Sequence, residues 1–356
     1  MRITFTPNIY GTNNVRKENF KGLLHIDEQT GSPNDSWFFR DYGTLSDAAS
    51  DVRENFPKGA DIWDYACANG EESISIKGFL PENRYRVKGF DISNDPLKLA
   101  KKGIYSLFSF WHDSFLMSGF ENTYDKFIKD TGNFAPSIEE RRNLRELFMR
   151  IMEPAEYKSE YKYINNRYVA MLERRTNPNF REEYYRLKSE FKDSIAIEYG
   201  DINHIDKLPK ERAVGAIFFR NGIYQLCDNN ITEVMSGYGL NNWNVNRGKV
   251  CEDLVDKIYR VLDENGIFVI GTHIKEHLFL ANKYTPREDR MFLSETPFFN
   301  PNNKHHRYCS DLCCEQPLYK ALLKEGRFEP VKYSFARIFK GDPFVKVPVI
   351  WKKVKI

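Results

Sequence analysis

Residues whose types and spacing could do chemistry lie around one bend, within residues 61–76. The first half of this stretch is a short apolar run typical of a strand buried on both faces, and the second half has the spacing of a helix. Gly70 stands at the bend and Glu71 opens the helix. A glycine lets the backbone approach a nucleotide-like ligand, and the start of a helix offers free N–H groups. The same pattern occurs in α/β proteins with nothing bound there, so this stretch alone leaves ligand binding open.

Two acidic residues stand close behind predicted strands. Asp91 follows the segment 85–90, and Asp201 comes shortly after the segment 195–199. A carboxylate at the end of the second strand of such a sheet can accept both ribose hydroxyls of a nucleoside. The alternative for Asp91 is a solvated aspartate that opens a turn. A nicotinamide cofactor is the competing hypothesis, but it requires three glycines spaced G-x-G-x-x-G, and this bend has only Gly70.

Blocks of sequence along the chain extend this pattern. In order, they are WFFRD at 37–41, CANGEE at 67–72, GFDI at 89–92, LAKKGIY at 99–105, IFFRN at 217–221 with Tyr224, and LDENGIF at 262–268. Their order and chemistry resemble the cofactor domain of the CheR-type chemotaxis receptor methyltransferases, over about half of the chain. The resemblance implies S-adenosyl-L-methionine as cofactor and S-adenosyl-L-homocysteine as product.

The resemblance also implies roles for individual residues at the cofactor. Arg40 would pair with the cofactor carboxylate, and Glu71, helped by the Ala66 carbonyl, would bind its ammonium group. Asp201 would accept from the adenine amine while Ile202 packs on the ring, although the family more often has Asn near that position. The predicted cofactor-binding residues are Arg40, Ala66, Gly70, Glu71, Asp91, Ile92, Asp201, Ile202 and Asn221.

The methyl acceptor is expected to approach after the strand predicted at 213–219, where Arg220 and Tyr224 follow. A carboxylate acceptor would already be ionised at neutral pH, because a free glutamate titrates near pH ~4.3, and would need no general base. The protein would only have to align the oxygen with the sulfonium methyl and exclude water. Arg220 and Tyr224 are therefore the predicted catalytic residues. Packing of Arg220 against the cofactor or a loop is the alternative.

The periodicity predicts an α/β fold with a parallel sheet, and the resemblance implies that this fold is a doubly wound, Rossmann-like class I methyltransferase. We expect a mostly parallel seven-stranded sheet with an antiparallel last strand, plus a helical insertion. Strands are predicted at 62–66, 85–90, 195–199, 213–219, 267–271, 331–339 and 345–351, and helices at 45–56, 71–79, 96–102, 250–262 and 317–324. A further helix is predicted from the capping box of Ser137 and Glu140 through Ile151, and Pro154 is expected to end it.

The domain organisation departs from the CheR family in two places. Residues 1–35 form a predicted N-terminal arm, too short for the helical domain that the family usually carries, which puts receptor recognition in doubt. Residues 36–356 form the methyltransferase domain, with 118–192 as an inserted, mostly helical subdomain, because an ordinary crossover needs far fewer residues. Solvated helices on the domain edge are one interpretation of the insertion, and a substrate- or partner-binding subdomain is the other. Because the predicted nucleotide residues lie outside it, replacing 137–192 with a linker is expected to leave cofactor binding intact.

Composition narrows the class of protein. The chain has 356 residues, 41% of them hydrophobic, with 53 basic and 50 acidic side chains that nearly balance. This predicts a folded protein with no general attraction to nucleic acid, and the apolar runs are too short to insert into a membrane. No signal-peptide pattern is present, and six scattered cysteines do not make a disulfide framework, so we expect a cytoplasmic protein with reduced thiols.

Metal binding is not expected. A candidate cluster of histidines and cysteines occurs at 305–314, but its spacing fits none of the usual zinc ligand sets. The sequence therefore predicts a methyltransferase that transfers a methyl group to a carboxylate oxygen, protein glutamate O-methylation by resemblance. A methyltransferase of a small molecule or a non-receptor protein, and a cofactor-binding regulator without turnover, remain the alternatives; the sequence names neither the acceptor nor the oligomeric state.

Overall fold

The computed structural model describes residues 38–39, 42–106, 138–156, 184–220, 247–270, 315–336 and 345–356. They fall into two compact units. One comprises the described parts of Gly22–His204 and Pro209–Phe218, and the other those of Ile205–Leu208 and Phe219–Ile356. No helix in these described segments is both long and apolar enough to cross a bilayer.

The central element is a seven-stranded sheet with the order β6-β2-β1-β7-β8-β10-β9. Its strands are β1 (Asp61–Tyr65), β2 (Arg86–Asp91), β6 (Ile195–Tyr199), β7 (Val214–Phe218), β8 (Ile267–Val269), β9 (Phe328–Ala336) and β10 (Val345–Lys353). β1 pairs in parallel with β2 and β7, and β2 with β6, whereas β10 is antiparallel to β8 and β9. Counted along the chain, the order is 3-2-1-4-5-7-6, with the seventh strand reversed. This confirms the predicted class I methyltransferase fold.

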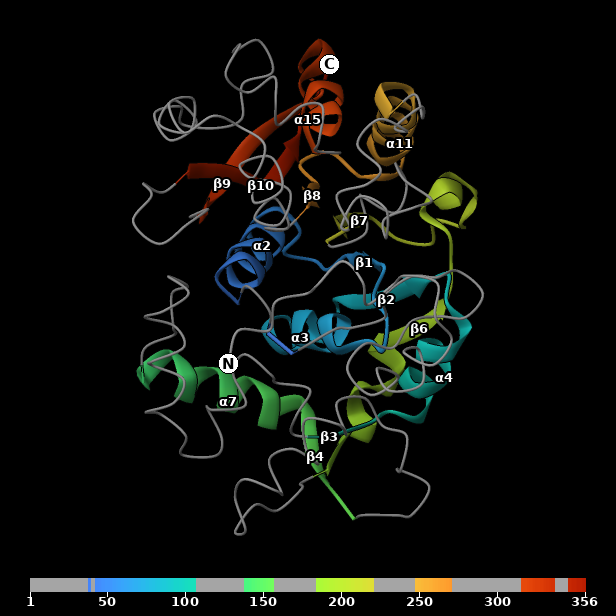
Figure 1. Cartoon of the computed structure of the whole chain (residues 1–356). Helices are drawn as coiled ribbons and strands as arrows, with labels where there is room; N and C mark the ends of the chain where they lie inside the picture. Colours follow the sequence, from blue (N-terminus) through green and yellow to red (C-terminus); the bar gives the residue numbers. More distant parts are fainter. Residues whose placement is uncertain are drawn as a thin grey trace, which may run out of the picture. The chain divides into compact units, whose positions relative to one another are not determined.

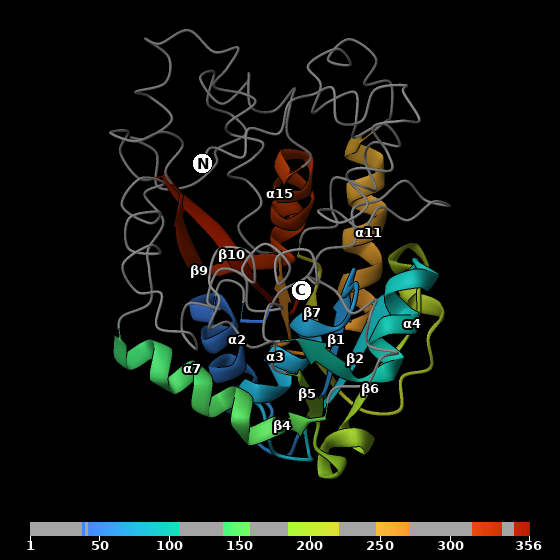
Figure 2. The same cartoon turned by 60° about the horizontal axis from the view of Figure 1, so that its bottom comes forward.

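In the first unit, helices α2 (Tyr42–Asn55), α3 (Glu71–Phe79) and α4 (Asn94–Lys102) accompany β1, β2 and β6 (Figure 1). All five residues of β1 and β7 are buried, as expected for strands covered on both faces. Helix α3 also buries nearly its whole surface, because α2 and α7 (Ile138–Ile151) both pack against it (Figure 2).

The insertion contains a helix, as predicted, and also strands that the sequence analysis did not predict. Its strands β5 (Tyr184–Leu187) and β4 (Met152–Ala155) form a three-stranded antiparallel sheet with β3 (Ile104–Ser106), which precedes the insertion. Pro154, predicted to end the preceding helix, lies within β4, and the helix ends three residues earlier because the positions before a proline disfavour helical backbone. A 3-10 helix, Ser189–Ser194, leads into β6.

A hydrophobic cluster joins the insertion to α3 and to the aromatic pair at 38–39. It brings together the aromatic pair at 38–39, one face of α7, and residues of α3 and β3. Its buried members are Phe38, Phe39, Ile74, Tyr105, Leu144, Phe148, Ile151, Met152, Tyr185 and Phe191. Burying a large apolar side chain stabilises the fold by roughly 1.5–3 kcal/mol, so this cluster is a major source of the unit's stability.

The second unit contains β8, β9 and β10 together with α11 (Arg247–Val261) and α15 (Glu315–Leu323), which pack against each other. The buried indole of Trp351 on β10 stacks on Tyr319 of α15, with ring centroids 5.6 Å apart. The Tyr259 hydroxyl donates to the Val354 carbonyl at 3.0 Å, fixing the segment after β10 on α11.

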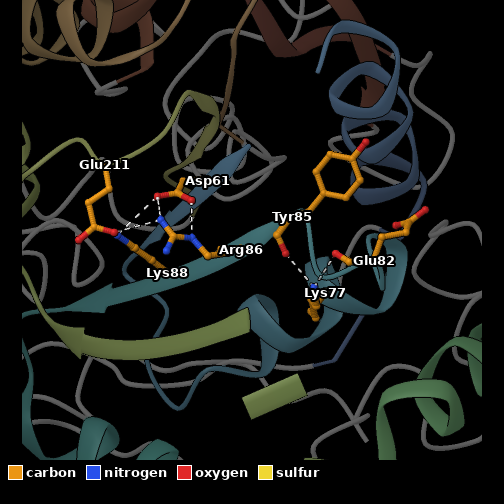
Figure 3. A network of polar contacts seen from close by, with 7 residues as sticks. All are labelled: Asp61, Lys77, Glu82, Tyr85, Arg86, Lys88 and Glu211. Atoms are coloured by element: carbon orange, nitrogen blue, oxygen red, sulfur yellow. Dashed lines mark hydrogen bonds and ion pairs between the residues drawn. The ribbon is translucent and has the colours of Figure 1, made fainter. Parts of the chain in front are cut away.

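Two polar networks support the edge of the sheet where β1 and β2 begin (Figure 3). In one, the buried Asp61 carboxylate accepts from Arg86 Nε at 2.9 Å and lies 3.5 Å from Lys88 Nζ, and Arg86 also reaches Glu211. In the other, the ammonium group of Lys77 on α3 donates to the carbonyls of Glu82 at 3.0 Å and Tyr85 at 2.7 Å. The first network ties β2 to β1, and the second ties α3 to the turn that leads into β2.

The Lys77 side chain is fully buried, and its burial lowers the pKa of the ammonium group to about 8. Between about pH 8 and the ordinary value of 10.5, the unfolded chain holds a proton that the folded chain has released. The free energy of unfolding contributed by this group therefore rises with pH across that window. Lys77→Met is expected to lose this rise in denaturant titrations from pH 7.5 to 10.5. Wild-type and variant curves that run parallel with pH would contradict the assignment.

Candidate cofactor site

The candidate site centres on the loop between β1 and α3, called here the 66–70 loop. Three of its residues adopt left-handed backbone, with φ values of 59° at Ala66, 49° at Ala68 and 87° at Gly70. The Gly70 N–H donates to the Cys67 carbonyl at 2.8 Å and closes the turn. Left-handed backbone is uncommon outside glycine and persists where the surrounding structure enforces it, often at functional sites.

Contacts from two other parts of the chain hold this loop. The Ala68 N–H donates to Asp91 Oδ2 at 2.8 Å, and the Cys67 N–H donates to the Phe90 carbonyl at 3.2 Å. From the other side, the Tyr105 hydroxyl donates to the Asn69 carbonyl at 2.9 Å. The loop is therefore fixed to the end of β2 and to β3 at the same time.

Asp91 occupies the predicted position at the end of β2 and is 7% exposed. Its second oxygen, Oδ1, accepts from the Ser93 N–H at 2.8 Å. Two backbone amides thus set the orientation of the carboxylate. A carboxylate has about four lone-pair sites, so these two hydrogen bonds do not by themselves exhaust its capacity as an acceptor.

Carboxylates gather around the loop. The Glu71 side chain is fully buried at the first position of α3, and Asp64 on β1 accepts from the Ser73 hydroxyl at 2.6 Å. Burial raises the pKa of the Cys67 thiol well above its usual value, and the nearby charges of Asp64, Asp91 and Glu71 raise it further. An anionic site of this kind suits a cationic ligand. It opposes a pyrophosphate, which in nicotinamide-binding folds lies at the start of this helix.

Gly70 is required here for a reason that the sequence analysis did not identify. A Cβ at this position would stand 2.2 Å from Ile197 Cδ1 and 3.4 Å from the Tyr105 hydroxyl. The glycine was expected to leave room for a ligand, whereas the described contacts show the protein's own side chains filling that direction. Its positive φ adds a second requirement.

Asp201 and Ile202 follow β6 and start the 3-10 helix Ile202–Lys207. Asp201 Oδ1 accepts from the Asn203 N–H at 2.9 Å, and Oδ2 lies 3.4 Å from His204 Nδ1. Ile202 is 4% exposed. Asp201 is also near the buried Tyr65 hydroxyl, whose pKa is raised by burial first and by the Asp201 charge second. Contact of Asp201 with adenine stays a prediction.

The structure describes some of the remaining predicted residues and leaves the others outside its described segments. Ile92 is 39% exposed immediately after Asp91, and Arg220 follows β7 with a buried side chain. Arg40, Asn221 and Tyr224 lie outside the described residues, as does the histidine and cysteine cluster at 305–314. Within the described segments, no three potential ligands come together as a metal site would require.

The structure adds two kinds of supporting residue that the sequence analysis missed. Ser75 Oγ accepts from the Phe39 N–H at 2.7 Å and donates to the Glu71 carbonyl at 2.7 Å, which anchors the aromatic pair before Arg40 on the first turn of α3. Tyr105 holds the 66–70 loop. The G-I-Y string was the available signal for Tyr105, whereas a serine inside a helix gave none.

Comparisons with known proteins give no family assignment. No family model and no curated protein matches the chain. Among solved structures, a candidate O-methyltransferase from Klebsiella pneumoniae has a TM-score of 0.39 at 7% identity, covering 98% of this chain and 93% of its own. A SAM-dependent methyltransferase from Methanosarcina mazei has a TM-score of 0.35 at 11% identity, covering 86% and 97%. An N-methyltransferase from Bradyrhizobium japonicum has 0.34 at 7%, covering 88% and 97%.

These TM-scores are too low to carry an argument. One of these proteins is named as an O-methyltransferase and another as an N-methyltransferase, so their names do not indicate one kind of acceptor atom. The fold assignment rests on the strand order, and the cofactor assignment rests on the residues of the site.

Proposed function

We propose that this protein is an S-adenosylmethionine-dependent methyltransferase of CheR-like type that transfers the methyl group to a carboxylate oxygen. The observation that carries the proposal is the pairing of Asp91 with the 66–70 loop, in a sheet with the class I methyltransferase order. This pairing puts an oriented carboxylate at the end of β2 and a buried Glu71 beside it. Both charges suit a cofactor that carries ribose hydroxyls, an ammonium group and a sulfonium.

The chain's own residues would bind the cofactor in two parts. Asp91 would accept hydrogen bonds from the ribose hydroxyls, since two amides already orient its carboxylate. Glu71 and the Ala66 carbonyl would bind the ammonium group, and Ile202 would pack on the adenine. Bound S-adenosylmethionine would supply an activated methyl group for transfer to a nucleophile.

The acceptor part of the proposal depends on Arg220, Asn221 and Tyr224, the residues after β7. A guanidinium stabilises an anionic nucleophile in a dry site and disfavours a lysine ammonium, and no histidine or acid stands immediately beside it in sequence to deprotonate an amine or alcohol. The acceptor class that fits is a carboxylate, on a protein or on a small molecule.

Methyl-labelled cofactor incubated with the protein and a lysate of its host tests this acceptor. Methyl esters hydrolyse in mild base and release volatile methanol, so we expect the labelled product to lose its label under that treatment. The Asp91→Ala variant serves as the control and should give little labelling. A product that keeps its label in base would reject the carboxylate and favour nitrogen or carbon, and an absence of labelling beside intact cofactor binding would favour a regulator without turnover.

A further inference from the structure

Tyr105 belongs to β3, a strand of the small sheet, yet its hydroxyl reaches the 66–70 loop. We propose that Tyr105 is a positioning residue that sets the affinity of this loop for the amino-acid part of S-adenosylmethionine, and that inserted residues hold Tyr105 in place for this task. The inference rests on the proposed function and adds a residue and a source of control to its cofactor site.

The contact between Tyr105 and the loop is direct and buried. The hydroxyl donates to the Asn69 carbonyl at 2.9 Å, and the tyrosine is 3% exposed. Burial raises the pKa of this phenol well above its usual value, and the charge of Glu71 raises it further, so the hydroxyl remains a donor at any physiological pH. Asn69 lies two residues before Glu71, which is predicted to bind the ammonium group together with the Ala66 carbonyl. Any shift of the Asn69 carbonyl therefore moves that end of the site.

Inserted residues clamp the Tyr105 ring through a chain of aromatic contacts. Tyr105 meets Phe38 edge to face at 5.2 Å, Phe38 meets Phe148 of α7 at 5.2 Å, and Phe148 meets Tyr185 of β5 at 5.1 Å. Tyr185 is in turn the register partner of Tyr105 in the small sheet. Edge-to-face pairs of this kind are favourable beyond the burial of their surface area. Phe148 and Tyr185 lie in the insertion, so its folding determines where the Tyr105 hydroxyl stands.

The loop needs this support because its own backbone preferences oppose its shape. Ala66 and Ala68 both adopt left-handed φ, which is unfavourable for an L-residue that carries a Cβ atom. A loop that relaxes in the free protein must be ordered again on binding, and that ordering lowers affinity. The hydrogen bond from Tyr105 keeps the loop ordered beforehand. These contacts also lead us to expect that replacing 137–192 weakens cofactor binding, opposite to the expectation from sequence.

Tyr105→Phe tests the proposal because it removes only the hydroxyl. We expect the Kd for S-adenosylhomocysteine, measured by calorimetry on the folded protein, to rise about 3- to 10-fold, as the loss of one net hydrogen bond implies. Tyr85→Phe is the matched control. Its hydroxyl is also buried, lacks a hydrogen-bond partner among the described residues and belongs to the same unit, so its Kd should stay within about 2-fold.

A second ligand separates positioning from general destabilisation. 5′-Methylthioadenosine keeps the adenosine and the sulfur but lacks the amino-acid part. Tyr105→Phe should therefore weaken its binding far less than that of S-adenosylhomocysteine, whereas general damage to the fold would weaken both equally. Equal losses, or no loss for either ligand, would overturn the positioning role. A wild-type chain that binds neither ligand would instead refute the proposed function, which is a distinguishable outcome.

The clamp is tested by Phe148→Leu, alone and combined with Tyr105→Phe. Phe148 is buried in α7, and its ring contacts Phe38 and Tyr185, the ring neighbour and the register partner of Tyr105. We expect Phe148→Leu to raise the Kd for S-adenosylhomocysteine in the wild-type background and to have a much smaller effect once the hydroxyl is gone. Additive effects in the double variant, or no effect of the single variant, would show that the insertion does not act through Tyr105.

Discussion

Asp91→Ala is expected to remove most of the stabilisation that S-adenosylhomocysteine gives the wild-type protein against heat. The ribose hydroxyls would lose a charged acceptor, and the Ala68 and Ser93 amides would lose theirs. A hydrogen bond to a charged group contributes roughly 1.5–3 kcal/mol, so affinity should fall by at least about 10- to 150-fold. Thermal melts with saturating ligand, supported by calorimetry, measure the effect, and NADH should shift neither protein.

Asp61→Asn is the control for this experiment. Asp61 is another buried carboxylate of the same unit. It is the first residue of β1, so it lies at the end of that strand away from the 66–70 loop, and it accepts a hydrogen bond from Arg86. Its replacement should lower the melting temperature without ligand and leave the ligand-induced shift unchanged. If both variants lost the shift equally, Asp91 would have no special role at the cofactor. If Asp91→Ala does not fold, Asp91→Asn keeps the side-chain shape and is expected to show the same loss of affinity.

Gly70→Ala is expected to destabilise the folded protein strongly and to impair cofactor binding. Left-handed backbone at φ 87° costs an alanine roughly 1–2 kcal/mol, and overpacking against Ile197 costs about 1–3 kcal/mol more. The free energy of unfolding should therefore fall by about 2–5 kcal/mol, as denaturant titration would measure. The Kd for S-adenosylhomocysteine should also rise, because the new methyl group pushes toward the Tyr105 hydroxyl.

The backbone and packing effects at Gly70 can be separated with two further variants. Gly103 also has positive φ, 61°, but no atom lies within 4 Å of where its Cβ would stand, so Gly103→Ala reports the backbone cost alone. Ile197→Val removes the Cδ1 atom that the new methyl would strike, and should recover part of the loss in the Gly70→Ala background. Equal costs at Gly70 and Gly103, with no recovery by Ile197→Val, would show that packing at Gly70 is unimportant.

The fold was largely predictable because its signals are local. Buried runs such as the one at 61–65 have the composition of strands covered on both faces, and α3 was predicted at the bounds that the structure shows. The position of Asp91 was predictable for the same reason, since it follows directly from the end of β2. The resemblance added the expectation of a class I methyltransferase sheet with an antiparallel last strand.

Residue type and chain position alone thus determined where the main strands lie along the chain, the bend at Gly70 and the carboxylate at the end of β2. Tertiary structure alone decided the small sheet β3-β5-β4, because its short strands pair across long sequence separations that no local periodicity records. Tertiary structure also determines that position 70 excludes a side chain, because Ile197, which occupies that space, belongs to a strand more than a hundred residues away. The contact between Tyr105 and the 66–70 loop also depends on tertiary structure. The Tyr105 hydroxyl donates to a backbone carbonyl 36 residues away, and only the folded chain brings that donor and acceptor together.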